Sequence, residues 1–417
     1  MNGIQPEKRI LVLNCGSSSL KYEVFAMPSR QSLGKGLVER IGESEGRLVQ
    51  TSPKGEATME QNIADHGVAM ELLGKALVHP DHGILGSLEE IDGIGHRVVH
   101  GGERFSASVL IDPEVIEAIE EASELAPLHN PPNLTGIREA ERLLPGVPQV
   151  GVFDTAFHQT MPPSAYLYGL PREFYDKHRI RRYGFHGTSH RFVATRAAKI
   201  LKRELEDTNL ITCHLGNGAS LTAIESGKSV DTSMGFTPLE GVMMGTRCGD
   251  IDPAILSYLE ERGYSFKQLN TIMNKKSGLL GLSGISNDMR DLEAAAERGE
   301  ERAQETLDVY AHKVRKYIGA YSANLVTVDA LVFTGGIGQH GVKMRERICH
   351  NLEHMGIVMD YELNKRVGNK EGIVSARYSQ TAILVVPTNE ELQIATDVFE
   401  LLGAAATWKK WDRTEDN

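Results

Sequence analysis

Residues 9–25 read RILVLNCGSSSLKYEVF, and residues 210–224 read LITCHLGNGASLTAI. In both stretches, apolar β-type residues lie on each side of a glycine- and serine-rich turn, which predicts a strand, a tight turn and a second strand. Glycines and small hydroxyl residues let backbone N–H groups converge on an anion without a Cβ atom in the way. Two such turns in one chain predict a duplicated phosphate clamp around a nucleotide.

The length and composition of the chain favour a globular protein of two domains. The chain has 417 residues, of which 41% are hydrophobic and 24% are charged. This length gives each domain enough apolar residues for a core. The net charge of −11 leaves no basic excess to neutralise nucleic acid phosphates. We therefore expect no nucleic acid partner, whereas a local cationic site for ATP remains compatible with this charge.

Cysteines and hydropathy predict a cytoplasmic protein. The four cysteines form no C-x-x-C pair, which indicates neither a zinc site nor a redox motif. So sparse a set suits a reducing compartment. Residues 1–8 are polar and lack the apolar core of a signal peptide. We see no apolar run of membrane-spanning length, so we expect no membrane association.

The remaining elements alternate between strands and helices. Residues 39–60 predict further hairpin strands, and residues 91–99, 150–153, 330–333 and 382–386 predict short buried strands. Residues 64–78, 113–126, 253–262, 303–325 and 390–402 have helical patterns. The polar tail from Thr407 is expected to be frayed. The chain contains one long-range duplication and no short repeat.

Several polar side chains stand where oxyanion or metal chemistry could take place. Arg97 and Arg247 lie in glycine-rich surroundings, and arginine binds carboxylate and phosphate bidentately. Asn14, Asp154 and Glu390 are oxygen donors at the ends of apolar runs, and Mg²⁺ prefers a few such donors together with phosphate and water. The alternative interpretation is structural, with ion-paired arginines, a turn asparagine and helix-terminal acids.

The glycine pattern at residues 335–341 allows an alternative interpretation of the function. Gly336, Gly338 and Gly341 satisfy G-x-G-x-x-G between a strand and a helix, and Asp360 has the spacing of a ribose-binding acid. This pattern predicts an NAD-dependent enzyme. A dinucleotide-binding domain normally carries the motif on its first strand, whereas here it follows two other glycine-rich turns. Neither a Walker A sequence nor a protein kinase signature occurs.

The sequence resembles the acetate kinase family, within the actin, hexokinase and Hsp70-like superfamily. The resemblance covers nearly the whole chain and depends on eight segments in a fixed order. These are NCGSSSLK (14–21), GHRVVHGG (95–102), FDTAFH (153–158), RYGFHGTSH (182–190), HLGNG (214–218), TRCGD (246–250), FTGGIG (333–338) and PTNEE (387–391).

The resemblance implies an α/β fold of two duplicated domains with central mixed sheets, with the active site in the cleft between the domains. Residues 1–154 and 390–417 would form domain I, and residues 155–389 would form domain II, through which family members form homodimers. The implied reaction is reversible phosphoryl transfer from ATP to acetate, which gives ADP and acetyl phosphate. Propionate kinase is the alternative within the family, and an actin- or Hsp70-like ATPase is the alternative from another class.

The resemblance also implies a role for each motif residue. Asp154, His186 and Arg247 would be catalytic. Acetate would be bound by Arg97, Val99, Leu128, His129, Phe185 and Pro238. Asn14 and Glu390 would hold Mg²⁺, for which Mn²⁺ could substitute. The nucleotide would be bound by Lys21, His214, Leu215, Gly216, Asn217, Gly218, Asp288, Met289, Arg290, Gly336, Ile337, Gly338, Gln339 and His340. The family usually continues its adenosine-binding turn with Gly-Glu-Asn, whereas this chain has Gln339 and His340.

Overall fold

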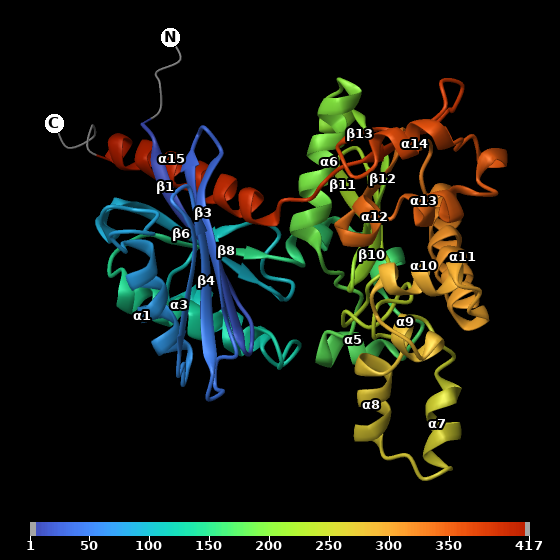
Figure 1. Ribbon diagram of the computed structural model, residues 1–417, viewed down its shortest axis with the longest axis horizontal. Helices are drawn as coiled ribbons and strands as arrows, with labels where there is room; N and C mark the ends of the chain where they lie inside the picture. Colours follow the sequence, from blue (N-terminus) through green and yellow to red (C-terminus); the bar gives the residue numbers. More distant parts are fainter. Residues whose placement is uncertain (1–5, 413–417) are drawn as a thin grey trace. The chain divides into compact units, whose positions relative to one another are not determined.

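A computed structural model describes the backbone of residues 6–412 and the side chains of residues 6–404 (Figure 1). The chain divides into two compact units. Unit 1 contains the N-terminal part up to Ala156 and the C-terminal segment from Asn389, and unit 2 contains Phe157–Thr388. The predictions for the first residues of the N-terminus and for the tail beyond Asp412 lie outside the described residues, although helix α15 (Glu390–Asp412) continues past Thr407.

The described part of unit 1 contains a mixed sheet with the strand order β5-β4-β3-β2-β1-β6-β8-β7. Strands β1 to β5 form an antiparallel meander, whereas β6 and β8 run parallel to β1. The turn between β1 and β2 therefore lies at the edge of the sheet where β6 and β8 also end. The strands are β1 (Lys8–Cys15), β2 (Ser19–Met27), β3 (Gln31–Glu39), β4 (Gly46–Ser52), β5 (Gly55–Gln61), β6 (Ile91–Val98), β7 (Val109–Leu110) and β8 (Gln149–Phe153).

Unit 2 repeats this arrangement in its described sheet, with the order β11-β10-β9-β12-β14-β13. Strands β9 and β10 form the second hairpin, and β12 and β14 run parallel to β9 as β6 and β8 do to β1. The predicted duplication with two central mixed sheets is confirmed. The strands are β9 (Leu210–Leu215), β10 (Ala219–Glu225), β11 (Lys228–Thr232), β12 (Ala330–Thr334), β13 (Gly372–Ile373) and β14 (Ala382–Val385).

Helices cover both sheets. Unit 1 has α1 (His66–Leu77), α2 (Pro113–Ala122), α3 (Asn130–Leu143) and α15. Unit 2 has α4 (Pro163–Tyr166), α5 (Arg172–His178), α6 (Gly187–Leu201), α7 (Ala254–Glu260), α8 (Phe266–Lys275), α9 (Gly278–Ser283), α10 (Met289–Glu297), α11 (Glu301–Asn324), α12 (Gly335–His340), α13 (Val342–Cys349) and α14 (Tyr361–Val367). Short 3₁₀ turns lie at Leu88–Glu90, Ala156–Thr160, Leu205–Asp207 and Glu353–Met355.

Most predicted elements occur within a few residues of the expected bounds. Two differences have local causes. The helix predicted over residues 113–126 ends at Ala122, because the next amides, from Ser123 to Leu125, donate to carbonyls three residues back instead of continuing the α-helical pattern. The glycine-rich segment predicted as an adenosine-binding turn is instead helix α12. It follows Thr334, which is extended, and its first residue is Gly335 at φ +74°. The turn prediction for residues 336–340 is therefore wrong.

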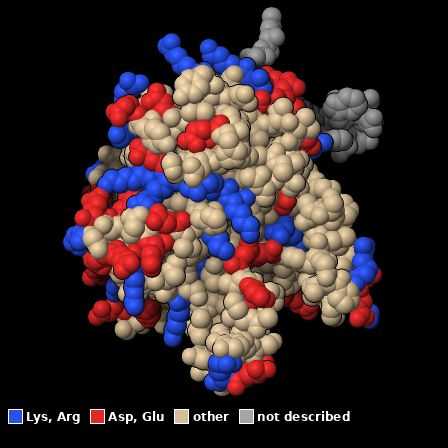
Figure 2. All heavy atoms as spheres, turned by 90° about the vertical axis from the view of Figure 1, so that its right-hand side faces the viewer, with Lys and Arg blue, Asp and Glu red and all other residues tan. Residues whose placement is uncertain are grey.

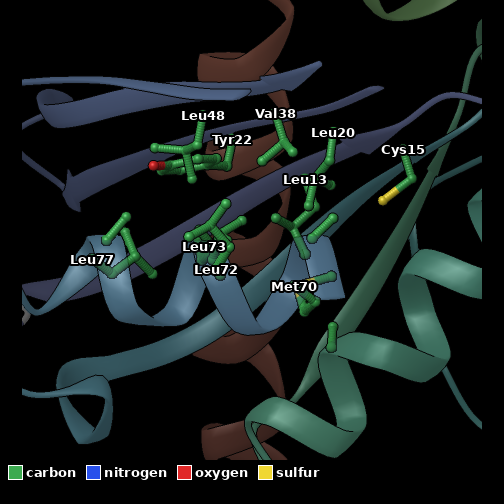
Figure 3. Packing of buried hydrophobic residues seen from close by; sticks show 14 of the residues in the cluster. Leu13, Cys15, Leu20, Tyr22, Val38, Leu48, Met70, Leu72, Leu73 and Leu77 are labelled. Atoms are coloured by element: carbon green, nitrogen blue, oxygen red, sulfur yellow. The ribbon is translucent and has the colours of Figure 1, made fainter. Parts of the chain in front are cut away.

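The unit 1 core between the sheet and helix α1 is closely packed. Leu13, Leu20 and Tyr22 from the hairpin face Met70 and Leu73 from α1, and all five side chains are buried (Figure 3). Burial of leucine-sized side chains contributes about 1.5–3 kcal/mol each to folding. This core fixes the plane of the hairpin, and hence the position of the turn at residues 16–18.

On the opposite face of the sheet, α15 lies against β6 at two glycines. A methyl group on Gly95 would lie 2.4 Å from Ile394 Cγ2, and one on Gly93 would lie 2.7 Å from Leu402 Cδ1. The missing side chains therefore let α15 approach the strand closely. Since α15 begins at Glu390, the two glycines also determine where this carboxylate lies.

We expect the substitution Gly95→Ala to lower the free energy of unfolding by about 1–3 kcal/mol, because the added methyl group overlaps Ile394. Urea unfolding followed by circular dichroism measures this change. Gly403→Ala in helix α15 is the control for a glycine-to-alanine change, because a methyl group at position 403 meets nothing within 4 Å. Equal unfolding midpoints for Gly95→Ala and the wild type would contradict the close approach of α15 to β6.

Candidate active site

In unit 1, an arginine and an aspartate meet at the ends of adjacent parallel strands. Arg97 Nη2 lies 2.5 Å from Asp154 Oδ2, and Arg97 Nε lies 3.2 and 3.1 Å from the two carboxylate oxygens. Asp154 is buried, whereas a quarter of the Arg97 side chain is exposed. The neighbouring Asp154 carboxylate raises the pKa of Arg97 above its usual range. Arg97 is therefore a fixed cation whose exposed edge can meet a second oxyanion.

Asn14 and Lys21 lie on the hairpin beside this pair. Arg97 Nη1 donates a hydrogen bond to Asn14 Oδ1 over 3.4 Å, and Lys21 is the Cα partner of Asn14 in the ladder. Both residues, together with Glu391, line a cavity of about 540 Å³ in unit 1. Asn14 thus connects the Arg97–Asp154 pair to the first hairpin, although neither member of the pair lines this cavity.

Helix α3 contributes two buried asparagines that the sequence analysis missed. The Asn133 side chain accepts a hydrogen bond from the Val99 amide and donates one to the Cys15 carbonyl. Asn130 likewise accepts a hydrogen bond from the His100 amide and donates one to its carbonyl. The asparagines tie the turn after β1 to the segment after β6. Adjacent prolines at positions 131 and 132 gave the only sequence signal, and they indicate a helix start rather than a function.

Glu390 is the second acidic residue of this cluster. Burial raises the pKa of its carboxyl from 4.5 to about 7; Arg97 and Lys21 oppose this rise, and the neighbouring carboxylates of Asp154 and Glu391 add to it. Because the site raises the pKa of the Glu390 carboxyl, a bound cation would stabilise the ionised form of this group. No cluster of three or more His, Cys, Asp or Glu side chains with metal-binding geometry occurs among the described residues. Mg²⁺ bound mainly through phosphate and water needs only one or two protein oxygens, so Asn14 and Glu390 fit it.

The structure places the predicted acetate-binding residues in different surroundings. Strand β6 ends at Val98, so Val99, the last residue of the strand predicted over residues 91–99, lies just beyond it. Val99 and Phe185 are buried, whereas Leu128 is 74% exposed and His129 is also exposed. Arg97, Val99, Leu128 and His129 belong to unit 1, whereas Phe185 and Pro238 belong to unit 2.

In unit 2, two cationic or proton-bearing side chains converge on the second glycine-rich turn. A methyl group on Gly218 would lie 3.4 Å from His186 Nε2 and 3.6 Å from Arg247 Nη1. Arg247 Nη1 donates hydrogen bonds to the Pro238 carbonyl and to Met244 Sδ, and burial lowers the pKa of the guanidinium. Among the described residues, these neutral groups are the hydrogen-bond partners of Arg247, and none is a carboxylate. The geometry suits a bound anion.

The imidazole of His186 is held by its neighbours. The ring stacks on His214 with 4.3 Å between ring centroids, and Nδ1 lies 2.9 Å from Ser220 Oγ. His214 Nδ1 in turn lies 2.7 Å from Ser189 Oγ. His186 itself adopts φ +58°, a left-handed conformation that is uncommon for a residue with a side chain. The surroundings of His186 therefore fix both its backbone and its ring.

A second cavity, of about 450 Å³, brings together residues from three predicted nucleotide-binding segments of unit 2. Eight of the predicted residues line it, namely Gly216, Asn217, Asp288, Met289, Arg290, Gly336, Ile337 and His340. Asn287, Glu293 and Gly341 line it as well and were not predicted. Leu215 and Gly338 are buried behind the wall, and the lining does not include His214, Gly218 or Gln339. Lys21 belongs to unit 1.

Helix α12 forms part of the wall of this cavity, and the fully buried side chain of Arg345 supports the helix. Its guanidinium donates hydrogen bonds to the carbonyls of Gly338, Gln339 and Gly368 and to Asn364 Oδ1, over 2.7–2.8 Å. Burial lowers the pKa of Arg345 to about 10. The side chain of Gln339 adds a hydrogen bond to the Asn369 carbonyl. The sequence alone offered no signal for Arg345.

Each of the two mixed sheets contains a glycine-rich hairpin whose first strand also pairs in parallel with a strand from a distant part of the chain. This two-unit α/β fold is shared with a solved acetate kinase. The chain belongs to the acetokinase family, whose model matches residues 9–396. The predicted family and fold are therefore confirmed, and the NAD-dependent alternative is wrong. Asp360, its proposed ribose acid, instead accepts a hydrogen bond from Leu363 N at the start of α14.

Named relatives agree with this family. The chain is 55% identical over 396 residues to an acetate kinase of Desulfitobacterium hafniense (strain DSM 10664 / DCB-2), covering 94% of this chain and 99% of the relative. Among solved structures, Porphyromonas gingivalis acetate kinase has a TM-score of 0.92 at 49% identity, covering 95% of this chain and all of that one. A Francisella tularensis propionate kinase has a TM-score of 0.88 at 43% identity, covering 94% and 99%.

The surface and the helices give two further facts. On the face shown in Figure 2, acidic and basic side chains are interspersed rather than separated into one basic surface. Among the described residues, no helix is both long enough and apolar enough to cross a bilayer.

We expect the stability of the protein to fall as the pH rises from about 5 to 8, because Glu390 has a higher pKa in the folded protein than in the unfolded chain. The folded state binds the proton more tightly in this window, so ionisation favours unfolding. Glu390→Gln should remove this dependence and be more stable than the wild type at pH 8, by the order of 1 kcal/mol.

Thermal unfolding at pH 5 and pH 8 measures this effect without substrates. Glu71→Gln, on an exposed position of α1, is the control for removal of a carboxylate. If the pH dependence of Tm is the same in Glu390→Gln and the wild type, another group causes it.

Proposed function

We propose that this protein is an acetate kinase that transfers the γ-phosphoryl group of ATP to acetate, with Arg97, Asp154, His186 and Arg247 in the reaction. The observation that carries the proposal is the guanidinium of Arg247. It lies beside His186 Nε2 at the second glycine-rich turn, and its described hydrogen-bond partners are uncharged. A half-buried arginine without a carboxylate partner is costly unless an anion occupies the site for part of the cycle.

The acceptor needs no general base. Acetate is ionised near neutral pH, so its oxygen can form the new bond to phosphorus while the bond to the ADP oxygen breaks. Its approach to the triphosphate is opposed by charge repulsion, which cationic groups relieve. We assign the exposed edge of Arg97 to the acetate carboxylate, because Asp154 fixes the other edge. Arg247 and His186 would contact the equatorial oxygens of the transferring phosphoryl group.

Asn14 and Glu390 would hold the magnesium ion, with Asp154 orienting its water. When bound, Mg²⁺ supplies positive charge to the phosphates. The raised pKa of Glu390 supports this assignment, because a nearby cation would favour its ionised form. Adenosine would occupy the cavity between Met289 and Ile337, with backbone amides of the hairpin at residues 214–218 and Lys21 on the phosphates.

The protein would act as a homodimer in the cytoplasm. Exposed apolar side chains gather on unit 2 at Ile255 and Tyr258 of α7 and at Tyr264 and Phe266 near the start of α8. A cluster of this kind favours protein–protein contact. The four cysteines are free thiols, of which Cys15, Cys213 and Cys349 are buried, and free thiols suit a reducing compartment.

Formation of acetyl hydroxamate from ATP, acetate and hydroxylamine tests the reaction. A carboxylate kinase gives hydroxamate only when acetate is present. An ATPase whose output is a conformational change would release phosphate at the same rate with or without acetate, and that result would refute the proposal.

We expect Arg247→Ala and His186→Ala to lower kcat by about 100–1000-fold each, with a much smaller change in the KM for acetate. The physical reason is that both groups would bind charge that develops in the transition state. Steady-state kinetics with saturating MgATP measures the two constants. Arg298→Ala is the control, because this exposed arginine pairs with Glu300 and lines neither cavity. Near-normal kcat in His186→Ala would remove His186 from the mechanism.

The size of the acceptor pocket distinguishes acetate from propionate as substrate. One extra methylene would gain about 0.8 kcal/mol if there were room, whereas overpacking costs about 1–3 kcal/mol. We therefore expect kcat/KM to favour acetate over propionate by the order of 10-fold. Val99→Ala should shift this ratio toward propionate. A wild-type preference for propionate would identify the chain as a propionate kinase and leave the carboxylate kinase chemistry intact.

A further inference from the structure

A buried hydroxyl group connects His186 to a second histidine. Ser220 Oγ, on strand β10, lies 2.9 Å from His186 Nδ1 and 2.7 Å from His190 Nε2. His190 belongs to α6, which begins directly after His186. These two imidazole nitrogens are the described hydrogen-bond partners of the Ser220 hydroxyl, so its single proton can go to only one of them.

The chain of hydrogen bonds continues one step further. His190 Nδ1 lies 2.7 Å from Thr212 Oγ1, on strand β9. Thr212, His190 and Ser220 are all fully buried. Burial keeps the pKa of His190 well below its usual value, with help from the neighbouring imidazoles of His158 and His214. His190 is therefore neutral and carries one ring proton.

The number of available protons determines which group donates at each step of this series of hydrogen bonds. If His190 carried its proton on Nδ1, it would donate to Thr212, and the Thr212 hydroxyl proton would have no acceptor among the described residues. A buried donor without an acceptor is strongly disfavoured. In the opposite direction every proton is used. Thr212 donates to His190 Nδ1, His190 Nε2–H donates to Ser220, and Ser220 donates to His186 Nδ1.

We infer that Ser220 is a positioning residue that keeps the proton of neutral His186 on Nε2, the nitrogen that faces Gly218 and Arg247. His186 then offers an N–H group to a phosphoryl oxygen without first becoming an imidazolium ion. The inference deepens the proposed function and rests on it in one respect: the proposed reaction identifies the acceptor of this N–H group as a phosphoryl oxygen. It concerns Ser220, His190 and Thr212, to which the proposed mechanism gives no role.

The surroundings of His186 agree with a neutral ring. His214 from β9 stacks on one face, and Arg247 shares the space around Gly218, so a second positive charge would be repelled. His158 supports the backbone, because its Nε2–H group donates to the Phe185 carbonyl over 3.0 Å while Nδ1 accepts from Ser229. The backbone and Nδ1 of His186 are thus held separately, and Nε2 lies on the side of the ring that faces Gly218.

The tautomer can be read directly from two-bond ¹H–¹⁵N spectra of histidine-labelled full-length protein without substrates, with His186 assigned from His186→Asn. We expect an Nε2–H tautomer with Nδ1 as a hydrogen-bond acceptor. Ser220→Ala should abolish the signature of the accepting Nδ1. An Nδ1–H tautomer in the wild type would overturn the inference, whatever the protein catalyses.

Kinetics provides the second measurement. Ser220→Ala should lower kcat by about 10- to 100-fold, with little change in the KM for acetate, and Ser220→Thr should restore most of the loss because it keeps the hydroxyl. In the wild type, kcat should stay level from about pH 6.5 to 8, because the donor is the neutral ring. A kcat that falls tenfold per pH unit in this range would indicate imidazolium instead and would refute the inference.

Thr222→Val is the matched control for loss of a buried hydroxyl from β10. Thr222 Oγ1 lies 3.0 Å from Thr232 Oγ1, which also donates to the Leu221 carbonyl, so its partner stays satisfied. This variant should leave the His186 spectrum and kcat unchanged. If no hydroxamate forms but the Nε2–H tautomer is present, the proposed function fails while the assignment of Ser220 stands.

Discussion

The structure depends on the way in which each hairpin is built into its sheet. The first strand of each hairpin pairs antiparallel with its own partner and parallel with a strand from a distant part of the chain. Parallel neighbours end at the same edge, so polar residues that follow them collect beside the glycine-rich turn. Asp154 after β8 and Arg97 near the end of β6 therefore meet the first turn, and the N-terminus of α12 meets the second. Backbone pairing, rather than any single side chain, gathers the site.

The two units handle positive charge differently. In unit 1, Arg97 is neutralised by Asp154 and surrounded by further carboxylates, so the cluster has an excess of acid. In unit 2, Arg247 lies among neutral acceptors and imidazoles. An acidic cluster favours a metal ion, whereas an unpaired guanidinium favours phosphate oxygens. The difference matches the requirements of a reaction in which a cation and a highly charged anion are used together.

Local sequence patterns predicted the strands and most helices, because each depends on nearby apolar spacing and turn residues. The prediction failed at residues 335–340, where glycine-rich sequence forms a helix, because a tertiary environment that includes buried Arg345 overrides the low helix propensity of glycine. Motif resemblance predicted eight of the residues that line the 450 Å³ cavity of unit 2. It could not find Ser220 or Asn133, since one serine among many gains its meaning only from the partners that the fold brings to it.

The hydrogen bonds of Arg345 have a consequence for the side chains that the α12 wall of the 450 Å³ cavity can carry. At positions 338 and 339 its guanidinium binds carbonyl oxygens, which every amino acid possesses. The path of the main chain is thereby held without a requirement on the side chains that it carries. The carbonyls of Gly338 and Gln339 are thus held whichever side chain position 339 carries. The arginine works as a template for the backbone of this wall rather than for its side chains.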